Sequence, residues 1–182
     1  MPTSKPELLT PVATQILALQ PSSVLDIGVG HGKWGYLARE YTDIWMRRYT
    51  RPEWKTRIDG IEIYPKYRNP VWDYAYNRVH TGNVLDLLSG LPRYDLCLML
   101  EVLEHFKKAE GLSLLSAILE KCDRAVISYT NCPQGEALGN VHETHRSEWS
   151  HDEISALTPA NRKLTVVYKD AYTGAYLFWS GT

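Results

Sequence analysis

Short apolar runs alternate with segments of helical periodicity along most of the chain. Runs of this kind, bounded by glycine, proline or asparagine, are typical of strands that are buried on both faces of a sheet. They predict strands at residues 22–28, 57–65, 77–82, 94–100 and 124–130. Between the runs, apolar residues at three- and four-residue spacing predict helices. We expect these helices at 11–19, from 33 through about 45, at 69–77 and at 107–122.

Two of the predicted helices carry further detail. Thr10 and Pro11 are typical of an N-cap and a first helical position, so the first helix is expected to begin there. In the helix before the fifth strand, Leu112, Leu115 and Leu119 share one face. That face is expected to be buried against the sheet.

The last part of the chain follows a different pattern. Ser150 and Glu153 match a capping box, which predicts a short helix. The stretch 163–181 then holds two strand-like runs, with a tight turn expected near Thr173 and Gly174. Because a parallel crossover needs a dozen or more residues, these two strands are expected to pair antiparallel.

Together the elements predict an α/β fold. Its core is a doubly wound, mostly parallel seven-stranded Rossmann-like sheet with a terminal antiparallel hairpin strand. No segment is left over for a second unit, so residues 1–182 are expected to form a single domain.

Composition and charge limit the binding partners and the cellular compartment that we expect. A formal net charge of -1 argues against a dedicated duplex-DNA binder, which usually carries a basic excess. Three cysteines without paired spacing are typical of a reducing compartment, and Cys97 and Cys122 lie in apolar runs expected in the core. No run approaches the roughly 20 apolar residues of a membrane span, and the N-terminus lacks a signal-peptide core. A cytoplasmic protein without membrane contact is expected.

The turn after the first predicted strand contains two overlapping glycine patterns within VLDIGVGHGKWGYLARE. Asp26, Gly28, Gly30 and Gly32 give an acid followed by G-x-G-x-G, whereas a second pattern, G-x-G-x-x-G, starts at Gly30. The second pattern is the dinucleotide fingerprint, whose first glycine directly follows the strand. Here that place belongs to Gly28, so the fingerprint starts two residues late and leaves Asp26 unexplained. A carboxylate at the strand end suits a cationic ligand and would repel a pyrophosphate, which favours the first pattern.

If the first glycine pattern is the relevant one, Gly35 and Trp34 have a structural role. Gly35 becomes a small residue where the following helix packs close to the sheet. Its neighbour Trp34 is expected in the core or in a pocket wall.

The stretch VLDIGVGHG resembles the first motif of the class I S-adenosylmethionine (SAM)-dependent methyltransferases, in particular the type 11/12-like small-domain members. The resemblance implies SAM as the cofactor and methyl transfer as the activity. It also implies cofactor contacts for Asp26, Gly28, Gly30 and Gly32. Glu62, which closes the second strand, matches the acid that binds both ribose hydroxyls in this family.

Two further motifs extend the resemblance. In TGNVLDL, Asn83 and Val84 stand where the family contacts adenine with an acid and a backbone N–H. Asparagine can still accept a hydrogen bond from the adenine amino group through its carbonyl. In YDLCLMLEVLEHF, Glu101 and His105 match a motif that borders the sulfonium and the substrate. The resemblance implies cofactor contact for Glu101 and makes both residues candidate catalytic bases.

The segment NVHETHRSEWS resembles a part of the family that lies over the substrate pocket. His145 is therefore a third candidate catalytic residue, and His145 or Trp149 is expected to contact the substrate. His142, Glu143 and His145 also raise the question of a metal site. H-E-T-H is not the zinc motif H-E-x-x-H, because its histidines are three apart and no distant ligand is evident. No metal ligand is therefore expected.

Two other functions fit parts of the pattern. One is a SAM-binding domain without transfer activity, and the other is an NAD-binding Rossmann-type enzyme that uses the later glycine pattern. Without an appended recognition domain, a small molecule or sugar-type acceptor is expected rather than a folded nucleic acid. The acceptor atom decides whether a base is needed, since only a hydroxyl or another weak acid requires one. The sequence leaves that atom and the oligomeric state open.

The spacing between Gly32 and Glu62 is longer than is usual in the family. The extra length lies in YTDIWMRRYTRPEWKTR, which is expected to form an extended helix and a loop and could bear on substrate access. Its basic stretch from Arg47 to Arg57 is expected on a solvated surface rather than in contact with nucleic acid.

Overall fold

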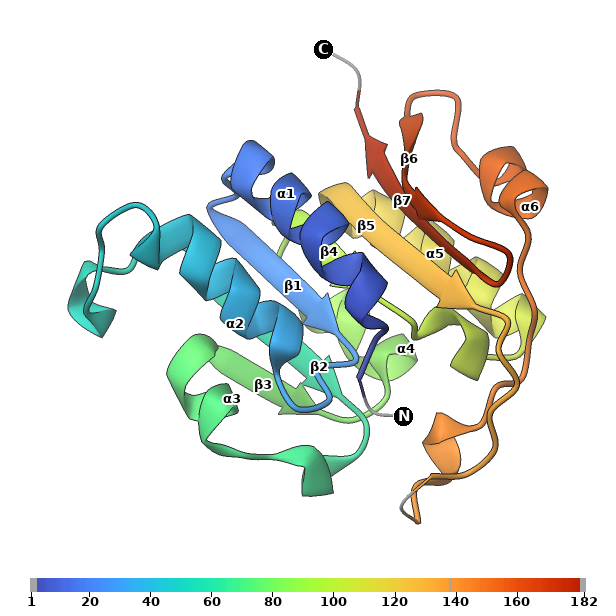
Figure 1. The fold of residues 1–182 in the computed structure, drawn as a ribbon, viewed down its shortest axis with the longest axis horizontal. Coiled ribbons are helices and arrows are strands. Elements are labelled where there is room, and N and C mark those ends of the chain that lie inside the picture. The colour runs from blue at the N-terminus through green and yellow to red at the C-terminus, as the bar shows by residue number, and fades with distance from the viewer. Residues whose placement is uncertain (1–2, 138, 181–182) are drawn as a thin grey trace.

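A seven-stranded sheet forms the centre of the computed structural model, which describes residues 3–137 and 139–180 (Figure 1). The strands are β1 (Ser23–Ile27), β2 (Arg57–Glu62), β3 (Arg78–Thr81), β4 (Tyr94–Met99), β5 (Cys122–Thr130), β6 (Lys163–Lys169) and β7 (Thr173–Trp179). The helices are α1 (Leu9–Leu19), α2 (Lys33–Arg39), α3 (Pro70–Ala75), α4 (Val84–Leu87), α5 (Lys108–Lys121) and α6 (His151–Ala156). The strand order is β3-β2-β1-β4-β5-β7-β6, in which β7 pairs antiparallel with both β5 and β6. The predicted fold class is confirmed.

Helices cover both faces of the sheet. One layer packs α1, α2 and α3 around a core that includes Val24 and Leu98, and the other packs α4, α5 and α6 around a core that includes Ile27 and Met99. Successive side chains of a strand point to opposite faces, which is why neighbours in β1 and β4 enter different cores. Among the described residues, no helix has the length and apolarity to span a membrane.

The first helix begins earlier than the sequence predicts. A short 3₁₀ turn (Pro6–Leu8) leads directly into α1, so Leu8 is the N-cap residue in place of Thr10. Pro11 is the third helical residue rather than the first. Proline is tolerated there because the N–H groups of the first turn have no intrahelical partner.

The buried face of α5 is also shifted from the predicted one. Leu115 and Leu119 are buried as expected, but Leu112 is 38% exposed. Leu114 and Ile118 complete the buried stripe instead. The buried face of α5 is therefore rotated by about one residue from the face that the sequence predicts.

The final hairpin turns before the predicted position. Asp170 accepts hydrogen bonds from the backbone N–H groups of Tyr172 and Thr173, both at 2.7 Å, and this side-chain cap forms the turn. Thr173 and Gly174 already belong to β7. Gly174 is required there for space, because a Cβ atom on it would lie 2.4 Å from the hydroxyl of Tyr176.

The long segment after α2 does not continue as a regular helix. A π-helical turn (Glu40–Ile44) follows α2, and a 3₁₀ turn (Arg51–Glu53) interrupts the loop beyond it. A π turn holds more residues than an α turn, so it rotates the following side chains around the axis. Trp45, the last residue of the helix expected from residue 33, follows this turn and is 62% exposed.

Candidate functional site

The glycine turn after β1 has the geometry expected for Gly28 as its first residue. β1 ends at Ile27, and Gly28 follows with a φ of 77°. Its N–H donates to the carbonyl of Ile61 at 2.9 Å, which ties the turn to the end of β2. A Cβ atom at Gly28 would lie 2.4 Å from a methyl of Val102, so only glycine fits. The turn therefore starts at Gly28 and not at Gly30.

Asp26 lies behind this turn and not in the cavity that the turn borders. It accepts a hydrogen bond of 2.5 Å from the Tyr76 hydroxyl, which in turn accepts one from the N–H of Gly35 at 3.1 Å. Burial raises the pKa of Asp26 to about 7, although the Tyr76 hydrogen bond opposes this rise. The close neighbour of Gly35 is this tyrosine ring rather than the sheet, since a Cβ on Gly35 would lie 2.0 Å from the ring. Through Tyr76, Asp26 thus connects the strand before the glycine turn to α2 and to the residue after α3.

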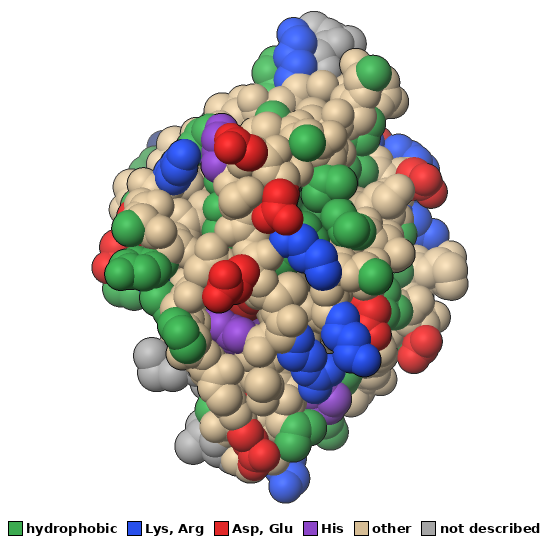
Figure 2. All heavy atoms as spheres, turned by 90° about the vertical axis from the view of Figure 1, so that its right-hand side faces the viewer, with side chains coloured by type: hydrophobic (Ala, Val, Ile, Leu, Met, Phe, Trp, Pro, Cys, Tyr) green, Lys and Arg blue, Asp and Glu red, His purple; other side chains and the backbone are tan. Residues whose placement is uncertain are grey.

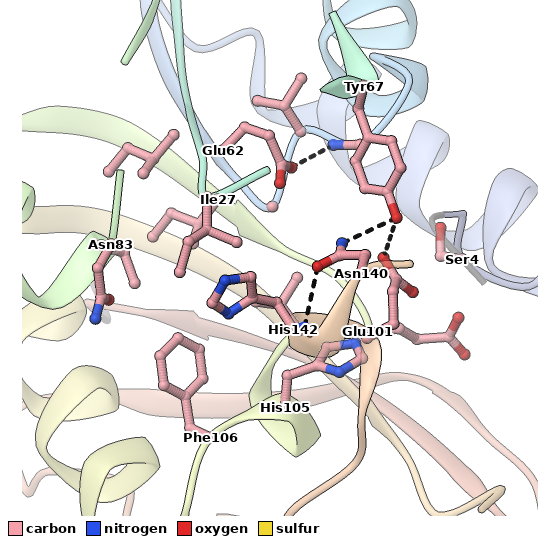
Figure 3. A pocket seen from close by; sticks show the side chains of 18 of the residues that line it. Ser4, Ile27, Glu62, Tyr67, Asn83, Glu101, His105, Phe106, Asn140 and His142 are labelled. Atoms are coloured by element: carbon pink, nitrogen blue, oxygen red, sulfur yellow. Dashed lines mark hydrogen bonds between the residues drawn. The ribbon is translucent and has the colours of Figure 1, made fainter. Parts of the chain in front are cut away.

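A cavity of about 250 Å³ opens where β1, β2 and β4 end (Figure 3). Gly28 and Gly30 line it, whereas Gly32 and Asp26 do not. Glu62 reaches into it from the end of β2 and is 5% exposed. Its carboxylate accepts hydrogen bonds of 2.8 Å from the N–H groups of Gly30 and Tyr64. Burial raises the pKa of Glu62, and these two hydrogen bonds limit the rise.

Asn83 and Val84 line the same cavity at the end of β3. Asn83 is the N-cap of α4, and its side-chain oxygen accepts a hydrogen bond of 3.0 Å from the N–H of Leu85. A carbonyl oxygen has two lone pairs, so this cap leaves one acceptor position open. Val84 is the first residue of α4, where a backbone N–H has no partner within the helix.

Glu101 enters the cavity from the loop after β4 with an unusual backbone. Its φ is 55°, a left-handed value that costs a residue other than glycine free energy and is typical of functional sites. One carboxylate oxygen accepts a hydrogen bond of 2.8 Å from the N–H of Lys5. The other is buried and has no hydrogen-bond partner among the described residues. Burial raises the pKa of Glu101, with Lys5 and Lys33 opposing the rise.

The N-terminal segment closes one side of the cavity, a feature the sequence analysis missed. Ser4 lines the cavity and accepts a hydrogen bond of 2.9 Å from the indole N–H of Trp34 and one of 2.5 Å from Lys33 to its carbonyl. Trp34 is both buried and part of the wall, as expected. The polar stretch before α1 carries no motif from which this contact could be predicted.

The segment between β5 and α6 covers another side of the cavity. Tyr67 donates a hydrogen bond of 2.8 Å to Glu143 and accepts one of 3.0 Å from Asn140 (Figure 3). Burial raises the pKa of Tyr67 to about 12, so its hydroxyl stays protonated and remains a donor. Tyr67 and Asn140 were not identified from the sequence, because each is a lone polar residue without a recognisable spacing. His142 lines the cavity, as the resemblance implies for this segment.

The three remaining candidates lie in different surroundings. His105 lines the cavity, and burial lowers its pKa to about 4. His145 instead lines a second cavity, which shares Arg146 with the first, and burial lowers its pKa as well. Trp149, expected to contact substrate, lines neither cavity and is buried in the core at 2% exposure. Its ring packs over Gly111, where a Cβ would lie 2.7 Å from it.

Comparisons with known proteins agree on the fold. No family model matches the sequence, and no curated protein is significantly similar to it. Magnesium protoporphyrin IX methyltransferase (ChlM) from Synechocystis PCC 6803, with bound SAM, aligns over 96% of this chain and 79% of its own at 14% identity and a TM-score of 0.65. A SAM-dependent methyltransferase from Archaeoglobus fulgidus aligns over 94% and 93% at 15% identity and a TM-score of 0.64. The small RNA methyltransferase HEN1 aligns over 97% of this chain but 25% of its own, at 16% identity and a TM-score of 0.67.

The chain therefore has the fold of the class I SAM-dependent methyltransferases, as the motifs predict. At these identities the likeness defines the fold, and the chemistry must be argued from the site itself.

Proposed function

We propose that this protein binds SAM and transfers its methyl group to an acceptor. One observation carries the proposal: the glycine turn after β1, the Glu62 carboxylate and an unpaired carboxylate oxygen of Glu101 meet in a single cavity. An unpaired buried carboxylate is costly, and a cationic ligand offsets that cost. SAM has a cationic amino group and a sulfonium at one end and a ribose diol in the middle, so the residues present fit it.

Each cavity residue has a defined part in this proposal. SAM would supply an already activated methyl group, so the protein has to align the acceptor and exclude water. Gly28 and Gly30 allow close approach of the cofactor, and Glu62 holds the ribose hydroxyls. Asn83 accepts from the adenine amino group, and the N–H of Val84 donates to the ring.

Glu101 lies at the reacting end of the cavity. Its unpaired oxygen is placed to attract the cationic part of SAM and to accept a proton from a hydroxyl acceptor. Asp26 and Gly32, which do not line the cavity, act by holding the turn in place. The later glycine pattern required for an NAD enzyme is disfavoured, because Gly28 occupies the turn directly after β1.

The acceptor that we propose is a small molecule or a sugar-type compound. The N-terminal domain of EvdMO1, crystallised with S-adenosylhomocysteine (SAH) and D-fucose, aligns over 92% of this chain with a TM-score of 0.60 at 14% identity. The net charge of -1 gives no support for a nucleic-acid acceptor.

The cysteines support a cytoplasmic location as part of the same proposal. Cys97 and Cys122 are buried as expected, Cys132 is partly buried, and all three thiols are free. Unpaired thiols are typical of a reducing compartment.

Calorimetric titration with SAM, SAH and NAD tests the cofactor. We expect SAM and SAH to bind and NAD not to bind. Glu62→Gln keeps the side-chain volume but removes the charge that receives the ribose hydroxyls, so SAM should bind about 10- to 100-fold more weakly. Glu120→Gln, an exposed change on α5, is the matched control and should leave the affinity unaltered. Failure to bind SAM at millimolar concentration, or an unaffected Glu62→Gln variant, would refute the assignment.

A second measurement separates transfer from binding. SAH release is followed while small hydroxyl compounds and sugars are offered as acceptors. Release with one acceptor class supports methyl transfer. SAM binding without release across the whole set would favour a SAM-binding domain that lacks transfer activity.

A further inference from the structure

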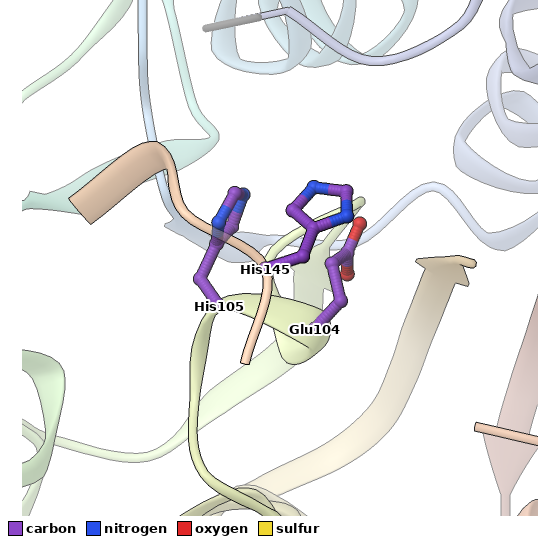
Figure 4. A group of neighbouring side chains, drawn as sticks. All are labelled: Glu104, His105 and His145. Atoms are coloured by element: carbon purple, nitrogen blue, oxygen red, sulfur yellow. The ribbon is translucent and has the colours of Figure 1, made fainter. Parts of the chain in front are cut away.

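Three potential metal ligands converge between the two cavities. Glu104 and His105 lie in a 3₁₀ turn (Leu103–His105) after β4, and His145 comes from the segment after β5 (Figure 4). One ligand atom from each side chain can be chosen so that all lie within 4.8 Å of one another. The two imidazole rings are 4.8 Å apart between centroids at an angle of 75°.

Backbone contacts hold this cluster in place. The N–H groups of Arg146 and Ser147 donate to the carbonyl of Glu104 at 2.8 and 3.2 Å, so the segment carrying His145 is fixed to the turn that carries the other two side chains. Nδ1 of His105 lies 3.4 Å from the carbonyl of Thr144. A histidine that donates one ring N–H to a backbone carbonyl keeps its other nitrogen free to bind a metal, an arrangement found at most protein metal sites.

Glu104 provides a second, independent observation that points to a cation site. Its side chain is completely buried, and one carboxylate oxygen accepts a hydrogen bond of 3.2 Å from the N–H of Thr130. The other oxygen has no hydrogen-bond partner in the part of the chain that the structure describes. Leaving such a group unpaired is expensive, and a bound cation would remove the cost.

We propose that Glu104, His105 and His145 bind a divalent first-row transition-metal ion. Two imidazoles and one carboxylate suit zinc, iron or cobalt, whereas magnesium and calcium prefer oxygen ligands only. Ligands about 2.1 Å from an ion lie at most about 4.2 Å apart, so small side-chain rotations close the observed set. Three protein ligands leave coordination positions open for a further molecule.

The three-residue cluster adjoins both cavities. His105 lines the cavity assigned to SAM, and His145 lines the neighbouring one. An ion held here would bind a hydroxyl of the acceptor and lower its pKa, so the two histidines would act as metal ligands and the proton would pass to the unpaired oxygen of Glu101. This consequence rests on the proposed methyl transfer, whereas the metal site itself does not.

Cobalt binding to the untagged, EDTA-treated protein tests the site directly. We expect one Co²⁺ per chain in equilibrium dialysis, together with visible d–d absorption bands that are clearly more intense than those of aqueous Co²⁺, as a site of low coordination number gives. His145→Asn and His105→Asn should each weaken binding about 100-fold or more and abolish the bands. His151→Asn, on α6 and outside the cluster, is the matched control and should bind as the wild type does.

The outcomes separate this inference from the proposed function. Stoichiometric Co²⁺ binding lost in both cluster variants, with far-UV circular dichroism unchanged, supports the site whether or not SAM binds. No Co²⁺ binding to a protein that still binds SAM would overturn the metal site and leave the proposed function intact. Variants at His105 and His145 that bind Co²⁺ as tightly as the wild type would overturn it as well.

Discussion

Asp26 is a buried carboxyl group with a structural contact, although it belongs to the stretch that resembles the first motif of the class I methyltransferases. It is 1% exposed, and its hydrogen bond to Tyr76 joins β1 to the residue that follows α3. Because its pKa is raised from 3.8 to about 7, the folded protein binds this proton more tightly than the unfolded chain does. The stabilising contribution is complete below about pH 4 and is lost as the pH rises through about 7.

We therefore expect Asp26→Asn to flatten the pH dependence of stability. The amide can accept the Tyr76 hydrogen bond without carrying a buried charge. Relative to this variant, the wild type should lose up to about 4 kcal/mol of unfolding free energy between pH 4 and 8. Urea unfolding of the cofactor-free protein across this range measures the effect, and parallel curves would contradict it.

Asp95 is a suitable control because its pKa shift has the opposite sign. Burial pushes its pKa upward, but hydrogen bonds from Ser22 and Ser23 outweigh this effect and bring the pKa below its usual value. A lowered pKa contributes stability that is present at neutral pH and lost in acid. Relative to Asp95→Asn, the wild type should thus lose stability as the pH falls below about 4.

At the scale of elements, the long segment after α2 is held by one buried acid. Asp43 is fully buried and forms ion pairs with Arg39 and Arg48, and it accepts a hydrogen bond of 2.8 Å from the N–H of Lys55. The Arg39 guanidinium also lies 4.3 Å from the ring of Trp54. No residue of this segment lines either cavity.

Asp43→Ala should destabilise the protein by about 3–5 kcal/mol, because it leaves the buried Arg39 charge without its partner. Thermal or urea unfolding measures the loss, and SAM affinity of the folded fraction should stay the same. Arg68→Ala, which breaks an exposed ion pair with Asp73, should cost at most about 1 kcal/mol. Equal effects of the two changes would show that Arg39 is not held by Asp43.

At the scale of the whole molecule, a strand near the C-terminus occupies a central place. β7 lies between β5 and β6, and its residues from Thr173 to Phe178 are buried. β6 has a partner on one side only and is mostly exposed. Figure 2 shows the face that lies on the right-hand side of Figure 1, and acidic and basic side chains are interspersed over this face. Lys163 and Lys169 at the ends of β6 are of the kind that discourages edge-to-edge association.

Native-state hydrogen exchange should reveal this arrangement. We expect the amides of β7 to exchange only through global unfolding, because they are paired and buried on both sides. The amides of β6 that face the open edge should exchange through local opening at a clearly lower free energy. If β7 exchanged as fast as a fraying terminus, its central role would be refuted.

Much of this molecule could be read from local sequence signals. The alternation of apolar runs and helical periods predicts the strands and their mostly parallel arrangement, and Ser150 caps a helix as expected. The predictions from these signals were wrong where the local backbone geometry departed from the regular pattern. Asp170 formed the last turn earlier than the glycine pattern indicated, and a π turn replaced the last part of the regular helix expected from residue 33.

Periodicity, turn chemistry and motif spacing determined the strand ends, the glycine turn and the presence of Glu62 and Glu101 beside it, because these are properties of contiguous residues. Tertiary structure alone decided which side chains from distant segments contact one another. The hydrogen bond from Tyr76, fifty residues along the chain, holds Asp26 away from the cavity, and docking of the segment after β5 brought His145 to Glu104 and His105. A spacing rule such as H-E-x-x-H describes ligands within one helix. It could not detect ligands about forty residues apart, which come together only in the folded protein.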